Sequence, residues 1–138
     1  IRLTHCYGMV GTGRGNAPDS GSGAEMYVVT GHAPRHLDRN ANLFGRVIKG
    51  MELLTVLPRG KGVMGVYAAD QTLPRIQSIR LAAEVPESER EKLEILRTDS
   101  KAFKAFIQAR RNRAEDWFLY QANGLDIGNI QVLQRVKK

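Results

Sequence analysis

The chain has 138 residues, of which 42% are hydrophobic and 25% are charged. These values are ordinary for a globular domain with one core, so they exclude a chain that is disordered throughout. The longest apolar runs span only a few residues, far short of a membrane-spanning helix, and we expect no membrane association. The single cysteine, Cys6, excludes an internal disulfide.

The net charge of +7 and the isoelectric point near 9.9 raise the question of a nucleic-acid partner. Basic residues are spread along the chain, and their one tight cluster is Arg110, Arg111 and Arg113. No recognised nucleic-acid-binding module accompanies this cluster. We therefore predict a solvated basic surface and no specific nucleic-acid partner, while nonspecific attraction to polyanions stays open.

The first part of the chain alternates between short strands and glycine-rich loops. Residues 1–14 predict a strand that runs into glycines, and residues 11–23 predict an irregular loop because glycine, proline, asparagine and aspartate favour turns. Apolar, β-forming residues predict two more strands at 26–30 and 43–48, the first of them fully buried. Residues 50–57 predict a short helix, which the following proline ends.

The middle of the chain predicts a third loop, over residues 59–74, and then another strand. Ile79, Leu81 and Ala83 alternate with polar or small neighbours. Side chains in a strand point to its two faces in turn, so this alternation is typical of a half-buried strand.

The sequence changes in character from residue 86 onward. Residues 86–92 predict one or two helical turns, and residues 93–96 predict a strand. A helix is expected over residues 101–113, with Ser100 as its N-cap and an apolar face. Two further strands are expected on either side of an Asn-Gly turn, over residues 117–120 and 130–136.

Four short motifs stand in order along the first half of the chain, at residues 8–14, 24–28, 36–38 and 43–51. They read Gly-Met-Val-Gly-Thr-Gly-Arg, Ala-Glu-Met-Tyr-Val, His-Leu-Asp and Leu-Phe-Gly-Arg-Val-Ile-Lys-Gly-Met. In order and spacing, over about residues 7–82, they resemble G-x-x-x-M-A-x, S-Q-F-F-I, [WFH]-L-D and V-F-G-x-V-x-x-G-M. These are motifs of the cyclophilin family of peptidyl-prolyl cis-trans isomerases.

The resemblance implies a mainly β fold. We expect a cyclophilin-like β-barrel, incomplete at its N-terminal side, with a short helix and a C-terminal αβ extension. Residues 1–85 are expected to form the barrel portion, and residues 86–138 the extension packed on it.

One family motif, F-H-R-x-x-x-x-F-x-x-Q-x-G-D, has no match in residues 1–138. In the family it carries the arginine credited with assisting the prolyl nitrogen. We therefore expect an N-terminal portion that precedes Ile1 and carries this arginine, which could stay bound as a separate chain. Arg14 resembles the bacterial-type members, and an N-terminal portion that was removed leaves room for an export signal. We therefore favour a periplasmic or otherwise exported location over a cytoplasmic one.

Prolyl isomerisation requires an apolar pocket for the proline ring, polar groups that hold the peptide backbone, and a donor near the prolyl nitrogen. It requires no metal or other cofactor. The resemblance places Tyr27 at the aromatic floor of the pocket, with His36 and Leu37 at its rim and wall. The residues assigned to substrate binding are Thr12, Gly13, Arg14, Glu25, Tyr27, His36 and Leu37.

Several positions depart from the family pattern. Thr12 replaces a pocket methionine, and Glu25 replaces a glutamine with a group that accepts hydrogen bonds but cannot donate them when ionised. Ala41 stands where many members have a histidine, and one extra residue lies between Val29 and His36. Two functions therefore stay open: a prolyl isomerase that assists folding, and a non-catalytic module that binds proline-containing partners.

Other patterns predict no separate chemistry. Asp38 is interpreted as a turn-stabilising residue rather than a catalytic base. The glycine-rich segment 11–15 lacks the G-K-[ST] ending of a phosphate-binding loop. The three histidines, His5 among them, do not show zinc-site spacing with the cysteine.

Overall fold

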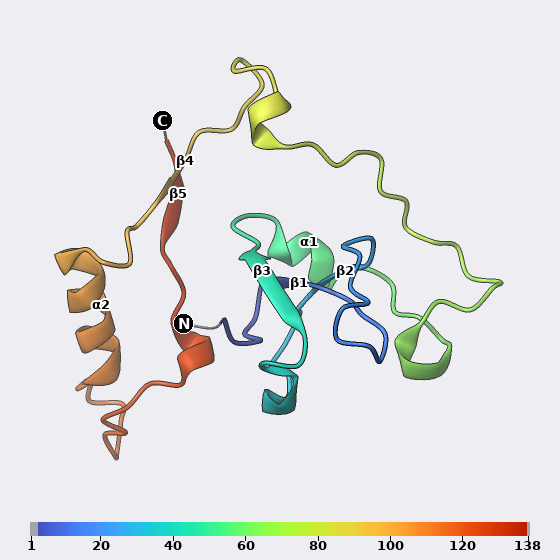
Figure 1. Cartoon of the computed structure of the whole chain (residues 1–138). Helices are drawn as coiled ribbons and strands as arrows, with labels where there is room; N and C mark the ends of the chain where they lie inside the picture. Colours follow the sequence, from blue (N-terminus) through green and yellow to red (C-terminus); the bar gives the residue numbers. More distant parts are fainter. Residues whose placement is uncertain (1–2, 138) are drawn as a thin grey trace.

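A computed structural model describes residues 3–137 and divides their strands between two small antiparallel sheets (Figure 1). The central sheet has the order β2-β1-β3, made of Met26–Val28, Met9–Thr12 and Asn42–Arg46. The second sheet pairs β4, Leu93–Ile95, with β5, Gln134–Val136. A closed barrel is not formed by the described residues, since β2 and β3 each end the central sheet without a further partner.

The central strand β1 pairs with both neighbours, and its register brings Gly11 opposite Tyr27 on one side and Leu43 on the other. The pairing with β3 shifts between Val10 and Gly11, so Phe44 is the extra residue of a β-bulge and is exposed. Because directly paired residues share a face of a sheet, Tyr27, Gly11 and Leu43 lie on one face.

Two α-helices agree with the predicted ones. Helix α1, Met51–Thr55, follows Gly50, whose φ of +86° favours glycine. Helix α2, Lys101–Arg111, begins at Ser100, whose hydroxyl accepts a hydrogen bond from the backbone N–H of Phe103 at 3.1 Å. No helix within residues 3–137 combines the length and the apolar character needed to cross a bilayer. Short 3₁₀ turns lie at Arg35–Leu37, Val63–Gly65, Ala82–Glu84 and Ile127–Asn129.

Two predicted strands are wrong. Ile79 and Leu81 lie in an extended segment with exposed side chains, and no strand of the described residues pairs with it (Figure 1). Residues 117–120 form turns, and β5 pairs with β4 instead of with this segment. Apolar alternation suits a strand, but a strand exists only where a partner satisfies its backbone groups. Residues 86–92 likewise form a turn instead of a helix, with the N–H of Glu89 donating to the carbonyl of Pro86.

The packed core of the described residues is small. Val29 is their one buried large apolar side chain, and Met26, expected in a fully buried strand, is 53% exposed. The accessible surface of 11862 Å² exceeds the value of about 7,200 Å² typical of a compact monomer of this mass. Much apolar surface of this chain is therefore open to contact by further polypeptide.

The C-terminal segment returns to the N-terminal one (Figure 1). Gly128 lies against Cys6, since a Cβ on the glycine would stand 3.2 Å from the cysteine sulfur. Lys49, which precedes α1, forms an ion pair with Glu91, just before β4. These contacts join the two sheets without a shared hydrogen-bonded ladder.

Candidate functional site

The candidate site is built around Tyr27, in the middle of β2. Its phenol ring lies over Gly11: a Cβ on this glycine would come within 2.4 Å of the ring carbon Cζ and of the hydroxyl oxygen. Gly11 is buried and Tyr27 is half-buried. The strand pairing thus seats the ring in space that only glycine leaves free.

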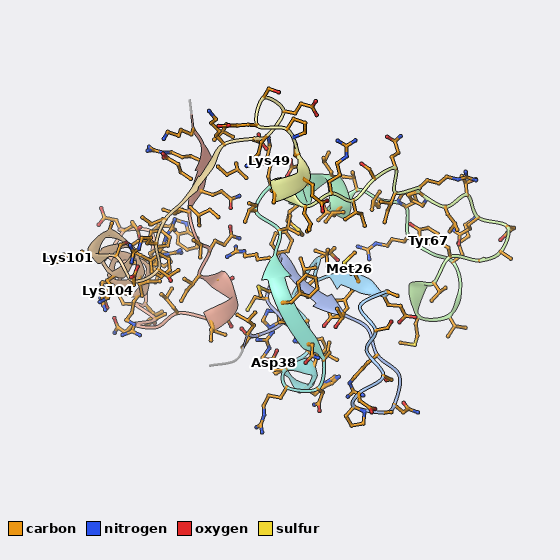
Figure 2. All side chains as sticks on the ribbon, turned by 45° about the horizontal axis from the view of Figure 1, so that its top comes forward. Met26, Asp38, Lys49, Tyr67, Lys101 and Lys104 are labelled. Carbon is orange, nitrogen blue, oxygen red and sulfur yellow. The ribbon has the colours of Figure 1, made fainter. Side chains whose placement is uncertain are left out.

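A chain of hydrogen bonds holds the hydroxyl of Tyr27. This oxygen lies 2.7 Å from Nε2 of His5, and Nδ1 of the same histidine lies 2.9 Å from Oδ1 of Asp38. The backbone N–H of His5 donates to the same carboxylate oxygen at 2.7 Å. His5 is 1% exposed, and its ring is nearly parallel to that of Tyr27, at 8° and 5.9 Å between centroids. These three residues, the Asp38–His5–Tyr27 relay, connect β2 to the loop beside the 3₁₀ turn Arg35–Leu37. Figure 2 shows Asp38 next to this turn.

The ionised state of Asp38 and the protonated state of Tyr27 determine which atoms of the relay donate and which accept. The backbone and ring hydrogen bonds from His5 lower the pKa of Asp38, and the nearby Arg35 guanidinium lowers it further. An ionised carboxylate can only accept, so Nδ1 of His5 carries a hydrogen, and Nε2 of the neutral ring accepts from Tyr27. Burial raises the pKa of Tyr27, which keeps its hydroxyl protonated. The phenol therefore turns its polar hydrogen toward His5.

Gly13 and Glu25 face each other where the β1–β2 pair ends. The N–H of Gly13 donates to the carbonyl of Glu25 at 2.7 Å, and a Cβ on Gly13 would stand 2.8 Å from the Glu25 carboxylate. The exposed carboxylate thus lies beside a bare backbone. Thr12 pairs with Met26, and because side chains alternate along a strand, both lie on the opposite face from Tyr27.

The side chain of Arg14 holds two loops together. Its guanidinium donates to the backbone carbonyl of Asn40 at 2.9 Å, and to those of Gly15 at 2.8 Å and Asn16 at 3.3 Å. The first of these bonds reaches from the glycine-rich loop to the loop that carries Asp38. Arg14 therefore stabilises the position of the site's rim.

His36 and Leu37 lie in the 3₁₀ turn, where His36 is exposed and Leu37 is half-buried. Arg35 of this turn donates to the backbone carbonyl of His5 at 2.7 Å and forms an ion pair with Asp38 at 3.3 Å. The relay and this arginine together fasten the turn to the strand that carries Tyr27. These contacts tie the turn that carries His36 and Leu37 to His5, the histidine that binds Tyr27, and the assignment of these residues to a proline pocket stays a prediction.

Two residues of this arrangement were missed in the sequence. His5 was considered only as a metal ligand, and Gly11 only as part of a loop. Neither has a local signal: the relay joins residues 33 and 22 positions apart, and the need for glycine depends on the register of β1 and β2. None of the five pockets that stand out in residues 3–137 is lined by Tyr27. Those residues also bring no three potential metal ligands together.

Comparison with protein families identifies the first part of the chain. Residues 1–80 match the family described as cyclophilin type peptidyl-prolyl cis-trans isomerase/CLD, which is more than half of the chain. The chain belongs to the cyclophilin family. The resemblance seen in the motifs is confirmed, and the matched residues contain the relay and Gly11, whereas α2, β4 and β5 lie beyond them. No curated protein matches the chain.

Proposed function

We propose that this cyclophilin domain binds proline-containing polypeptides and catalyses the cis-trans isomerisation of their prolyl bonds, in a folding-assistance role. Proline-containing peptides are the general ligands of the family. The observation that supports the proposal best is the seat of Tyr27, at the family's proline-pocket position. Gly11 fixes the ring, His5 binds its hydroxyl, and its half-buried face remains accessible.

Such an aromatic face acts on the barrier to rotation. That barrier is about 18–20 kcal/mol because the amide nitrogen shares its lone pair with the carbonyl group. An apolar surface that excludes water favours the twisted amide, in which charge is less separated. Since the Tyr27 hydroxyl is directed to His5, the phenol presents mainly carbon to a proline ring.

The other predicted site residues complete the proposed peptide groove. Leu37 and His36 would wall the proline ring from the 3₁₀ turn. Glu25 and the bare backbone of Gly13 would lie along the peptide, where the carboxylate can accept a peptide N–H. Arg14 would support this groove through its loop contacts. Thr12 lies on the opposite face of the sheet from Tyr27, so a peptide bound over the ring would not reach its side chain.

A second function, peptide binding without catalysis, is favoured by the contacts that Arg14 and Arg35 make within the chain. Arg14 binds three backbone carbonyls, and Arg35 binds Asp38 and the carbonyl of His5. Both guanidinium groups are thus engaged by groups of the chain itself, which would leave fewer donors for a prolyl nitrogen over Tyr27. The family includes non-catalytic forms, so binding alone is a function of the same fold.

We also propose that further polypeptide pairs with the free edges of β2 or β3. The large accessible surface and the open sheet edges support this proposal. We propose that the expected N-terminal portion pairs with one of these edges and brings its arginine to the site. We therefore expect high isomerase activity when this portion is present and little from residues 1–138 by themselves. An exported location stays a prediction, which fractionation of the producing cells tests.

A protease-coupled prolyl isomerisation assay, combined with a peptide-binding titration, separates these functions. The comparison uses the protein with its N-terminal portion, Tyr27→Ala, and Met26→Ala as the matched control on the opposite face of β2. Isomerisation that is lost in Tyr27→Ala and kept in Met26→Ala supports the catalytic proposal. Tyr27-dependent binding without acceleration supports the binding module. Equal behaviour of the two variants would rule out Tyr27 as the site.

A further inference from the structure

A second candidate site lies in the C-terminal part of the chain, beyond the family-matched residues. A pocket of about 380 Å³ opens between α2 and the segment that leads to β5. Helix α2 contributes Phe106, Arg110 and Arg111, and Arg113 follows just after it. This volume falls in the range of small-ligand sites. We name it the arginine–aromatic pocket.

The part of the chain that contains this pocket carries much of the net positive charge, and three arginines line the pocket itself. Residues 100–138 carry eight basic and three acidic side chains, a net charge of +5 out of the total of +7. Within residues 3–137, Arg111 and Arg113 have no ion-pair partner within 4.0 Å. The one acidic residue lining the pocket, Asp126, accepts from the N–H of Gly128 at 2.7 Å. Guanidinium donors are therefore available to an anion.

Aromatic rings accompany these arginines. The guanidinium of Arg110 lies 5.3 Å from the centre of the Phe106 ring, a cation–π arrangement. Phe118 lines the pocket and meets Trp117 edge to face, with 5.1 Å between ring centroids. Trp117 and Tyr120 are 83% and 89% exposed. Large rings exposed to this degree, a few residues along the chain from Arg113, are suited to stacking on a planar ligand.

Amide side chains complete the lining. Gln121, Asn129 and Gln131 each offer both donors and acceptors, as the edges of nucleobases require. An acidic peptide would use the arginines but would leave the exposed rings and the amides without a role. A nucleotide uses all three kinds of group.

We propose that the arginine–aromatic pocket binds a nucleotide unit of single-stranded nucleic acid, independent of base sequence. Arg111 and Arg113 contact phosphates, the amides contact the base in the pocket, and Trp117 and Tyr120 stack on neighbouring bases. Phosphate contacts and stacking carry little sequence information, and amide groups, which both donate and accept, can pair with the edge of more than one base. The site therefore agrees with the prediction of no specific nucleic-acid partner, and it does not rest on isomerase activity.

Fluorescence anisotropy with a labelled oligothymidylate of about 12 nucleotides tests the phosphate contacts. The variant Arg111→Gln/Arg113→Gln is compared with Arg75→Gln/Arg80→Gln, which removes the same charge from exposed arginines of the extended segment. We expect about tenfold weaker binding for the first and less than about twofold for the control, with a salt slope reduced by about 1.4 in the first. Equal losses in the two variants would mean general charge attraction and would overturn the proposal.

Trp117 is the only tryptophan of the chain, so its own fluorescence reports stacking. We expect quenching by the oligonucleotide and about tenfold weaker anisotropy-detected binding by Trp117→Ala. Polyglutamate that competes equally, with no quenching by the oligonucleotide, would indicate an acidic-protein surface and overturn the proposal. Saturable binding of thymidine monophosphate, with no gain from a longer strand, would reassign the pocket to free nucleotides and also overturn it.

Discussion

The family-matched residues 1–80 and the region around α2 differ in whether their polar side chains bind one another. In the family-matched sheet, Asp38, His5 and Tyr27 bind one another, and the ring that links them is almost fully buried. Around α2, the arginines remain exposed and unpaired among the described residues, beside exposed aromatic rings. Buried groups that bind one another hold a surface in one shape. Exposed groups without a protein partner bind water, which a ligand can replace. The first arrangement suits the peptide site proposed at Tyr27, and the second suits the nucleic-acid site proposed beside α2.

The largest effect is expected from Gly11→Val. The added side chain begins 2.4 Å from atoms of the Tyr27 ring, so the ring must move and the β1–β2 pairing must distort. We expect a loss of about 3 kcal/mol in the free energy of unfolding, measured by urea denaturation.

Gly31→Ala is the control, because a Cβ at that glycine meets nothing within 4 Å. Adding Tyr27→Ala to Gly11→Val should recover part of the loss, since the clash with the ring is then removed, while the clash with the carbonyl oxygen of Asn42, at 2.5 Å, remains. Strictly additive losses in the double variant would contradict the proposed seat of Tyr27.

A somewhat smaller effect is expected from His5→Ala. It leaves the Tyr27 hydroxyl without its buried partner and removes the ring hydrogen bond to Asp38, whose carboxylate keeps the backbone N–H of residue 5, and we expect a loss of about 2 kcal/mol in the free energy of unfolding. The exposed His32→Ala is the matched control. If both histidine variants unfold at the same denaturant concentration, the relay does not stabilise the sheet.

The next effect belongs to α2. Ser100→Ala removes the acceptor for the N–H of Phe103, and we expect a loss of about 1 kcal/mol confined to this helix. Hydrogen exchange of the α2 amides measures it, with the exposed Ser78→Ala as control. Faster exchange in β1 and β2 as well would show that the two regions unfold as one unit, which would contradict an effect confined to α2.

The smallest effect is expected with pH. Because the pKa of Asp38 is lowered in the folded state, the unfolded chain binds a proton first as the pH falls. The stabilisation from Asp38 is complete above its ordinary pKa of 3.8 and is lost as the pH drops through the lowered folded value. Urea denaturation from pH 6 to pH 3 should show a weaker pH dependence in Asp38→Asn than in Asp19→Asn. An identical dependence would remove Asp38 from this linkage.

Much of the local structure could be predicted from sequence because its causes are local. The serine before α2, the glycine and proline around α1 and the β-forming runs of β2, β3 and β4 each act within a few residues. The motif order likewise predicted the cyclophilin family, which the match over residues 1–80 confirms. Burial was not local: Met26 lies in a predicted strand yet is exposed, because no layer of the described residues covers it.

Sequence by itself determined the family and the two helices, and it aligned Tyr27 with the aromatic position of the family's motif. Tertiary structure decided that Gly11 makes room for this ring, that His5 binds its hydroxyl, and that Asp38 orients His5. It also decided that β5 pairs with β4. The physical reason is distance along the chain: capping and turn preferences act between near neighbours, whereas a hydrogen bond across 33 residues depends on strand register and loop path, which no single residue encodes.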